Sequence, residues 1–156
     1  MTLSLFARVN LFMDVSWIGT ATHFALFGFI VIYLILLGWI TGHRSYLTVT
    51  GKMKANGFST TGEEISPLAQ RVCRVHANVY ENFPIWGGLL IMAIITNSTS
   101  ITDGLAIIFL LARLGQVITH LISTSPNAVV VRFTFFSIQY LIAAYWIFRF
   151  AQKHFT

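Results

Sequence analysis

One stretch of the sequence decides the fold: residues 71–84 read RVCRVHANVYENFP and run directly into a long apolar segment. A helix advances about 100° per residue, so Arg74, Asn78 and Glu81 lie within roughly 60° of one another, with Arg71 at the edge of the same stripe. The opposite face of this helix is apolar. Charged side chains are costly inside a membrane and mark a functional site or a structural ion pair. We therefore predict a helix that enters a membrane with a polar seam along one side.

The composition indicates an integral membrane protein. Of the 156 residues, 56% are hydrophobic and 10% are charged, whereas a soluble domain carries about 25% charged residues. The length suits one domain, residues 1–156. The net charge of +5 comes from dispersed Lys and Arg rather than from the clustered patch that nucleic-acid binding needs. The first sixteen residues end without a small-residue cleavage site, so we expect no removed signal peptide.

Four segments are long and apolar enough to cross a membrane, which needs about 20 residues each. They are residues 17–40, 67–96, 102–122 and 128–150, with approximate ends. Ser66 is expected to cap the second segment, and Pro67 to open it. Residues 41–66 contain glycine breakers and no apolar period, so we interpret them as a solvent-facing loop. The other two connections are short, which makes neighbouring spans antiparallel. The predicted fold is all-α, a four-helix up-down membrane bundle.

The distribution of Lys and Arg predicts the orientation of the bundle, because cytoplasmic loops carry more of these residues. The side that holds the long loop carries Arg44, Lys52, Lys54, Arg71, Arg74 and Arg132. The other side carries Arg8, Arg149 and Lys153. Six against three places the long loop in the cytoplasm and both termini on the opposite side. Short loops favour a bacterial inner membrane over the endoplasmic reticulum.

Up-down topology brings polar side chains from several spans to the cytoplasmic level. They are Arg74, Asn78, Glu81, Gln116, His120 and Arg132, joined by Arg44 from the end of the first span. We expect the opposite half of the bundle to be almost uniformly apolar. Arginines bind carboxylates through paired hydrogen bonds, a carboxylate binds an ammonium group, and amides satisfy peptide groups. This inventory predicts a site for a small peptide-like ligand with several carboxylates.

The sequence lacks the residue patterns that several other functions require. No two histidines stand at the spacing of metal ligands, and carboxylates are few, so we predict no metal site. No glycine-rich phosphate loop, nucleophile elbow or CxxC motif is present. The single cysteine, Cys73, excludes an intrachain disulfide and is interpreted as a packing residue. A small transporter is disfavoured because no span is broken by Gly and Pro and the polar residues do not continue across the bilayer.

Two motifs together resemble the MAPEG family, the membrane-associated proteins in eicosanoid and glutathione metabolism. They are Arg71, Arg74, Asn78, Glu81 and Pro84 in the second span and the Leu-Ala-Arg that ends at Arg113 in the third. The resemblance extends over about residues 71–140 and is greatest to the microsomal glutathione transferases and the cysteinyl-leukotriene synthase branch. It implies a homotrimer of four-helix bundles that binds glutathione between subunits near the cytoplasmic face, with a lipophilic second substrate from the bilayer.

Site residues follow from this resemblance position by position. It implies a glutathione site formed by Arg71, Arg74, Asn78, Glu81, Gln116 and His120. It also implies that Arg132 stabilises the glutathione thiolate and that Arg44 reaches across from a neighbouring subunit. Gln116, His120 and Asn82 stand where the family has tyrosines, and the segment between His120 and Arg132 is longer than in the leukotriene enzyme. These departures favour a general transferase or peroxidase over leukotriene synthesis.

The chemistry needs no side-chain nucleophile. A free thiol with a pKa of about 8.5 is only a few per cent ionised at pH 7. Arg132 beside the sulfur would raise the thiolate fraction roughly tenfold or more. Structural alternatives stay open: mid-span Arg113 is expected to form an ion pair with Glu81, and the seam could serve only as contact between helices. The alternative function is a non-catalytic lipid-binding or adaptor protein on the same fold.

Overall fold

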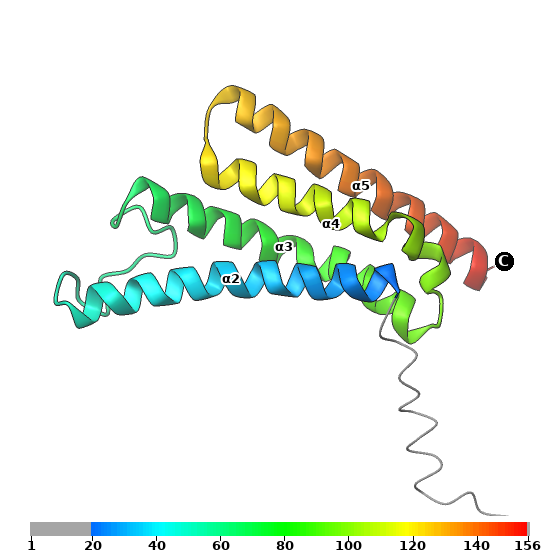
Figure 1. Ribbon diagram of the computed structural model, residues 1–156, viewed down its shortest axis with the longest axis horizontal. Helices are drawn as coiled ribbons and strands as arrows, with labels where there is room; N and C mark the ends of the chain where they lie inside the picture. Colours follow the sequence, from blue (N-terminus) through cyan, green and yellow to red (C-terminus); the bar gives the residue numbers. More distant parts are fainter. Residues whose placement is uncertain (1–19, 156) are drawn as a thin grey trace, which may run out of the picture.

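The computed structural model describes residues 20–155, which form four helices and, within that range, no strand (Figure 1). The helices are α2 (Ala21–Val49), α3 (Pro67–Ile95), α4 (Thr99–Ile122) and α5 (Pro126–Phe155). The predicted all-α four-helix bundle is confirmed. The expected start of the first span at Trp17 and the expectation about a signal peptide lie outside the described residues.

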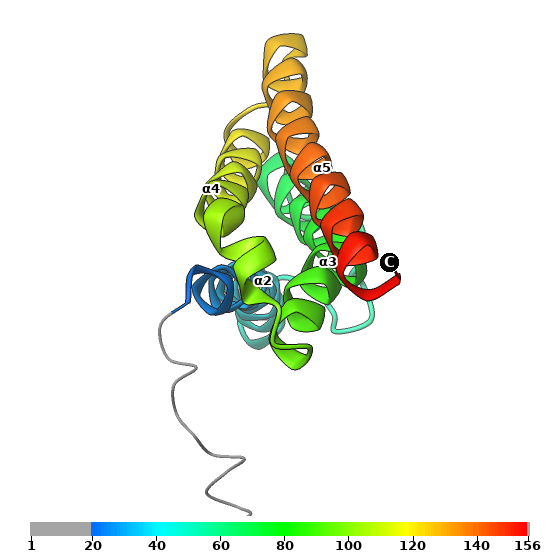
Figure 2. The same cartoon turned by 90° about the vertical axis from the view of Figure 1, so that its right-hand side faces the viewer.

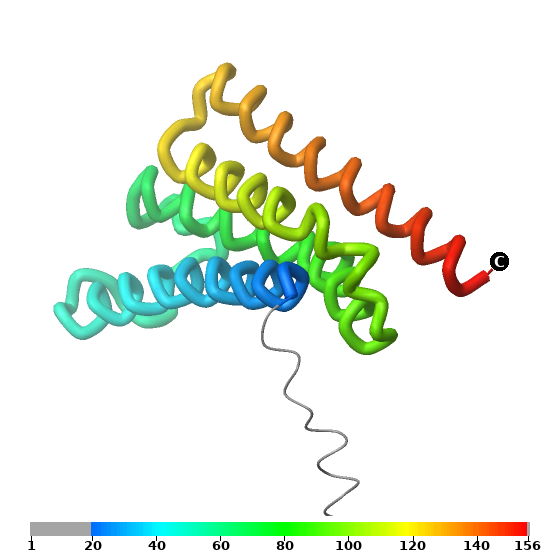
Figure 3. The backbone as a smooth tube through the Cα atoms, turned by 45° about the vertical axis from the view of Figure 1, so that its right-hand side comes forward, coloured from blue at the N-terminus to red at the C-terminus, as the bar shows by residue number. Residues whose placement is uncertain are grey.

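The connections alternate between the two ends of the bundle, as up-down topology requires. The long α2–α3 connection and the α4–α5 turn lie at one end, here named the connection end, and the α3–α4 turn lies at the other (Figure 1). Seen from the end opposite the connection end, the bundle has α2 and α3 on one side and α4 and α5 on the other (Figure 2). Helix α5 packs mainly on α4 and touches α3 only weakly. Helices α2 and α5 diverge toward the connection end (Figure 3).

The helix boundaries follow the sequence signals at α3 and depart from them at α2. The Ser66 hydroxyl accepts a hydrogen bond from the Ala69 amide at 3.1 Å, and Pro67 is the first helical residue, which confirms the predicted cap. Helix α2, however, continues to Val49 instead of ending near residue 40. The extension contains no proline, so the helix ends only at the turn before Gly51, where φ is +69°. The connection is therefore shorter than predicted.

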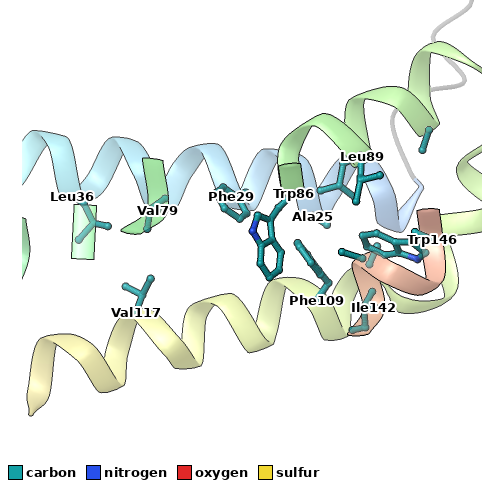
Figure 4. Packing of buried hydrophobic residues seen from close by; sticks show 14 of the residues in the cluster. Ala25, Phe29, Leu36, Val79, Trp86, Leu89, Phe109, Val117, Ile142 and Trp146 are labelled. Carbon is teal, nitrogen blue, oxygen red and sulfur yellow. The ribbon is translucent and has the colours of Figure 1, made fainter. Parts of the chain in front are cut away.

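Aromatic side chains fill the centre of the bundle. The rings of Trp86 and Phe109 lie 5.1 Å apart, and Phe109 lies 5.1 Å from Trp146, which is fully buried (Figure 4). Phe29 contacts Phe83 across α2 and α3 at 5.5 Å. Lipid chains are as apolar as these side chains, so close packing and hydrogen bonds, rather than exclusion of water, hold helices together in a bilayer.

Three helices, α2, α4 and α5, are long and apolar enough to cross a membrane. Helix α3 is of similar length, but its polar seam lowers its hydropathy, and it is not among these three. The protein is therefore an integral membrane protein, and α3 is the described helix with the polar seam.

The end opposite the connection end is more polar than the sequence led us to expect. The Asp103 carboxylate accepts hydrogen bonds from the Thr22 amide at 2.9 Å and from the Thr22 hydroxyl at 2.6 Å. Thr22 also bonds Thr102 at 2.7 Å, and Lys153 donates to Ser98 at 2.7 Å. The expectation of an almost uniformly apolar half is wrong. A helix start has unpaired amides, and a carboxylate from α4 satisfies one of them at the start of α2.

Candidate functional site

The seam of α3 divides into an exposed part and a buried part. Arg74 and Glu81 are exposed, and Asn78 is half-buried between them. From α4, Arg113 is fully buried and Gln116 is 7% exposed. The side chains predicted to form one pocket therefore belong to two different environments, an exposed cluster and an interior network.

The exposed cluster combines Arg74 from α3, His120 from α4 and Arg132 from α5 at the connection end. Both guanidinium groups lie close enough to the His120 ring to act on it electrostatically. His120 and Arg132 are half-buried, and Arg74 is exposed. Within residues 20–155, neither Arg74 nor Arg132 has a hydrogen bond or an anionic partner. Two unpaired cations beside an imidazole form a local excess of positive charge that suits an anionic ligand.

The interior network is centred on Arg113, and its hydrogen bonds go to neutral oxygen atoms. Its Nη1 donates to Asn78 Oδ1 at 3.2 Å and to Gln116 Oε1 at 2.9 Å, and its Nη2 donates to the Asn78 carbonyl at 2.9 Å. Gln139 Nε2 from α5 donates to the same Gln116 oxygen at 3.0 Å. The guanidinium lies over the Phe29 ring of α2, 5.1 Å from its centroid. One buried cation thus connects all four helices.

The predicted ion pair between Arg113 and Glu81 is not formed in the described part of the chain. Arg113 is fully buried, whereas Glu81 is exposed. The hydrogen bonds of Arg113 go instead to Asn78, about one turn before Glu81, and to Gln116. Neutral oxygens accept from both terminal nitrogens of the guanidinium, whose Nε is buried without a partner among the described residues. The Glu81 carboxylate keeps its hydration at the surface, which avoids the desolvation of a second charge.

In a comparison with known protein families, a model of the MAPEG family matches residues 22–152, most of the chain. The chain belongs to the MAPEG family. No curated protein and no solved structure matches the chain significantly. The family is membrane-associated and takes part in eicosanoid and glutathione metabolism, and it contains non-enzymatic members as well as glutathione transferases.

Two further arginines of this MAPEG protein lie outside the exposed cluster. Arg71 Nε donates to the Leu121 carbonyl at 2.8 Å, so it joins the start of α3 to the last turn of α4, where helix carbonyls lack partners. Arg44 Nη2 donates to the Ser59 carbonyl at 2.5 Å and lies near the Cys73 sulfur, at 4.0 Å. Arg44 thus faces a different side of α3 from Arg74.

Sequence reasoning missed how two amides of this MAPEG bundle, Gln139 and Asn82, are hydrogen-bonded. Gln139 is fully buried and bonds both Gln116 and the Phe135 carbonyl. Asn82 accepts from Trp86 Nε1 at 2.9 Å, one turn along α3. The available signal was an amide inside an apolar span, which is costly unless it finds a partner. Gln139 finds one on α4, and Asn82 finds one on its own helix.

Proposed function

We propose that this MAPEG protein is a membrane-bound glutathione transferase with peroxidase activity, which adds the glutathione thiolate to lipophilic electrophiles or uses it to reduce hydroperoxides. One observation carries the proposal: Arg74, His120 and Arg132 gather from three helices at one end of the bundle, with no counter-ion for the arginines among residues 20–155. Membership of the MAPEG family makes glutathione the ligand to test first.

The chemistry of glutathione matches the groups that stay available on the seam. Its carboxylates suit Arg74, which is exposed and unpaired in the described chain. Its ammonium group suits the exposed Glu81 carboxylate. Asn78 Oδ1 accepts a hydrogen bond from Arg113, which leaves Asn78 Nδ2 to donate to a peptide carbonyl. Gln116 Oε1 accepts from Arg113 and Gln139, and the side chain is only 7% exposed, so we assign Gln116 to support the site from within rather than to touch the ligand.

In this proposal, Arg132 lies beside the glutathione sulfur and stabilises its thiolate. A cation beside the thiol favours its ionised form, and each pKa unit of lowering corresponds to about 1.4 kcal/mol and a tenfold change in the acidity of the thiol. The thiol proton leaves to water, the thiolate forms a bond to the electrophilic carbon, and the leaving group departs with the electron pair of the broken bond. With a hydroperoxide, two glutathione molecules are oxidised to the disulfide while the hydroperoxide is reduced to an alcohol and water. An acceptor dissolved in lipid reaches the site laterally.

Assembly and topology complete the proposal. In it, α3 crosses the membrane with α2, α4 and α5, the connection end faces the cytoplasm, and the chain forms a homotrimer. A bacterial inner membrane is favoured over the endoplasmic reticulum. The reach of Arg44 into a neighbouring subunit, where it would act in catalysis, stays a prediction.

The test is turnover by the purified protein in detergent. With glutathione and an activated aryl halide, we expect conjugation well above the uncatalysed rate, and none with S-methylglutathione, whose thiol is blocked. One observation favours a second candidate, a non-catalytic lipid-binding or adaptor protein: Gln116 and Asn82, which replace family tyrosines, are both engaged inside the chain. Absence of turnover with several electrophiles and hydroperoxides would favour that second function.

A further inference from the structure

His120 is the member of the exposed cluster that can carry a proton. A guanidinium stays charged in proteins, so Arg74 and Arg132 act only through charge and hydrogen bonds. An imidazole can donate through one ring nitrogen and accept through the other, and it exchanges protons near pH 7. Within residues 20–155, the His120 ring has no hydrogen-bond partner. Both of its nitrogens are therefore available to a ligand or to water.

The last turn of α4 holds His120 in a fixed place against α3. Arg71 Nε of α3 donates to the carbonyl of Leu121, the next residue along α4, at 2.8 Å. The Ser123 amide ends the helix by donating to the Thr119 carbonyl at 3.1 Å. The backbone on both sides of His120 is thus hydrogen-bonded. Its side chain is half-buried, so the ring can meet the bundle on one side and solvent on the other.

The His120 ring lies near both parts of the proposed ligand site. Arg74 from α3 and Arg132 from α5 are each close enough to act on it electrostatically. The proposed function places a ligand carboxylate at Arg74 and the sulfur at Arg132, so a ring within range of both lies near the reacting atoms. Coulomb repulsion from the two guanidinium groups opposes a lasting positive charge on the ring. Such a ring passes a proton on rather than keeping it.

The two reactions of the proposed function differ in the group that leaves. In conjugation with an aryl chloride, the thiolate bonds to the ring carbon, and chloride leaves as a stable anion that needs no proton. In the reduction of a hydroperoxide, the thiolate sulfur bonds to the terminal oxygen, the O–O bond breaks, and an alkoxide leaves with the electron pair. An alkoxide leaves readily only when a positioned acid gives it a proton. The sulfenic acid formed on glutathione then reacts with a second glutathione to give the disulfide and water.

We propose that His120 delivers the proton to the departing alkoxide and so serves the reduction of hydroperoxides in particular. One ring nitrogen gives its proton to the alkoxide, while the other takes up from water the proton that the thiol released there. The ring is neutral before and after the step, and the product is the alcohol. This role rests on the proposed function and deepens it, because it assigns to one residue the step that separates the two reactions.

The test compares the two reactions in the same set of variants. Purified protein in detergent is assayed with glutathione and either cumene hydroperoxide or chlorodinitrobenzene. His120→Gln keeps a side chain that forms hydrogen bonds but does not readily transfer protons. It should reduce the hydroperoxide at least about tenfold more slowly than wild type and should conjugate chlorodinitrobenzene within about twofold of the wild-type rate. Imidazole added to His120→Ala should restore part of the hydroperoxide reduction and leave conjugation as it is.

The matched control is His154→Gln, an exposed histidine in the last turn of α5, which should leave both rates unchanged. Equal loss of both reactions in His120→Gln, or no loss of hydroperoxide reduction, would overturn the role of His120 and leave the proposed function standing. Wild type that conjugates but reduces no hydroperoxide would overturn it as well. If wild type catalyses neither reaction, the proposed function itself fails, and the role of His120 fails with it.

Melting curves identify any His120 variant that does not fold, and wild type in heavy water then decides. Because a proton is transferred as the O–O bond breaks, the solvent isotope effect should be larger on hydroperoxide reduction than on conjugation. Equal isotope effects on the two reactions would overturn the proposal.

Discussion

The interior network around Arg113 and the exposed cluster around Arg132 use the same kinds of residues on the same helices, yet their states are opposite. Arg113 is fully buried and donates three hydrogen bonds to neutral oxygen atoms. Arg74 and Arg132 have no anionic partner within the described chain. Cations whose hydrogen bonds are made inside the fold hold helices together, whereas unpaired cations at the surface are available to a ligand.

The energetic difference between the two regions has a clear physical origin. Burying a charge is expensive, and hydrogen bonds to neutral groups recover only part of that cost. In a bilayer, such bonds are among the few forces that specify how helices pack. Arg113 therefore contributes to the specificity of the bundle, while the exposed cluster leaves its positive charge uncompensated for function. Substitutions in the two regions should therefore separate stability from binding.

Replacing Arg113 with alanine should have the largest effect on stability. The substitution opens a cavity at the centre of the bundle and removes the cation that binds Asn78 and Gln116. The free energy of unfolding should therefore fall by about 3–5 kcal/mol. Arg113→Met should cost less, because it fills much of the volume and buries no charge. Thermal unfolding in detergent measures both. A Tm unchanged by Arg113→Ala would show that the network does not stabilise the fold.

Substitutions of the two glutamines of the network should lower the free energy of unfolding by different amounts. Gln116→Leu removes an oxygen that accepts from both Arg113 and Gln139, so it should cost about 1–3 kcal/mol. Gln139→Leu should cost less, because Gln139 Oε1 is buried without a partner among the described residues and its removal relieves that penalty. The double variant, compared with the two single ones, gives the coupling energy. A larger loss from Gln139→Leu than from Gln116→Leu would contradict the assigned geometry.

Arg74→Ala, in contrast, should weaken ligand binding and leave the stability of the free protein almost unchanged. Because Arg74 is exposed and unpaired in the described chain, the free energy of unfolding without ligand should change by no more than about 0.5 kcal/mol. Wild type with glutathione at 100 times its dissociation constant should gain about 2.7 kcal/mol. The variant at the same glutathione concentration should lose most of that gain. Melting curves with and without glutathione measure both quantities, and equal stabilisation of the two proteins would exclude Arg74 from the site.

The smallest effect concerns the connection between α2 and α3. The Ser59 hydroxyl donates to the Glu64 carboxylate, as does the Ser59 amide, and these bonds hold the pKa of Glu64 below its usual value of 4.5. A lowered pKa in the folded state stabilises the fold above the unfolded pKa, and this contribution is lost as the pH falls through the folded value. Wild type should thus be slightly more stable than Glu64→Gln at pH 7, and the difference should vanish below the lowered pKa. A difference that grows in acid would contradict this sign.

The sequence was sufficient to predict the bundle because its signals are local. Four long apolar segments, the Ser66–Pro67 start of α3 and the short turns gave the helices and their up-down order. The end of α2 was misjudged because glycines suggested a loop where nothing terminates the helix before Gly51. Residues of the exposed cluster were also predictable, since helical spacing and alternating direction bring Arg74, His120 and Arg132 to one end.

What the sequence could not give is how polar residues pair across helices. From depth alone, Arg113 and Glu81 were natural partners, because an unpaired charge inside a membrane is costly. In the structure, Arg113 donates to Asn78 and Gln116 instead. That choice depends on rotations and offsets of packed helices, which no periodic pattern encodes. The same limitation hid Gln139, whose partner lies on another helix.

The central claim is that the unpaired cations at the connection end hold glutathione as a thiolate, and ultraviolet difference absorbance tests it most directly. Glutathione titrated into wild type at pH 7 should produce a saturable thiolate band. Arg132→Ala should still bind glutathione but show little of this band, whereas Arg149→Ala, an exposed arginine at the other end of α5, should match wild type. No thiolate band in wild type, or an equal band in Arg132→Ala, would contradict the account.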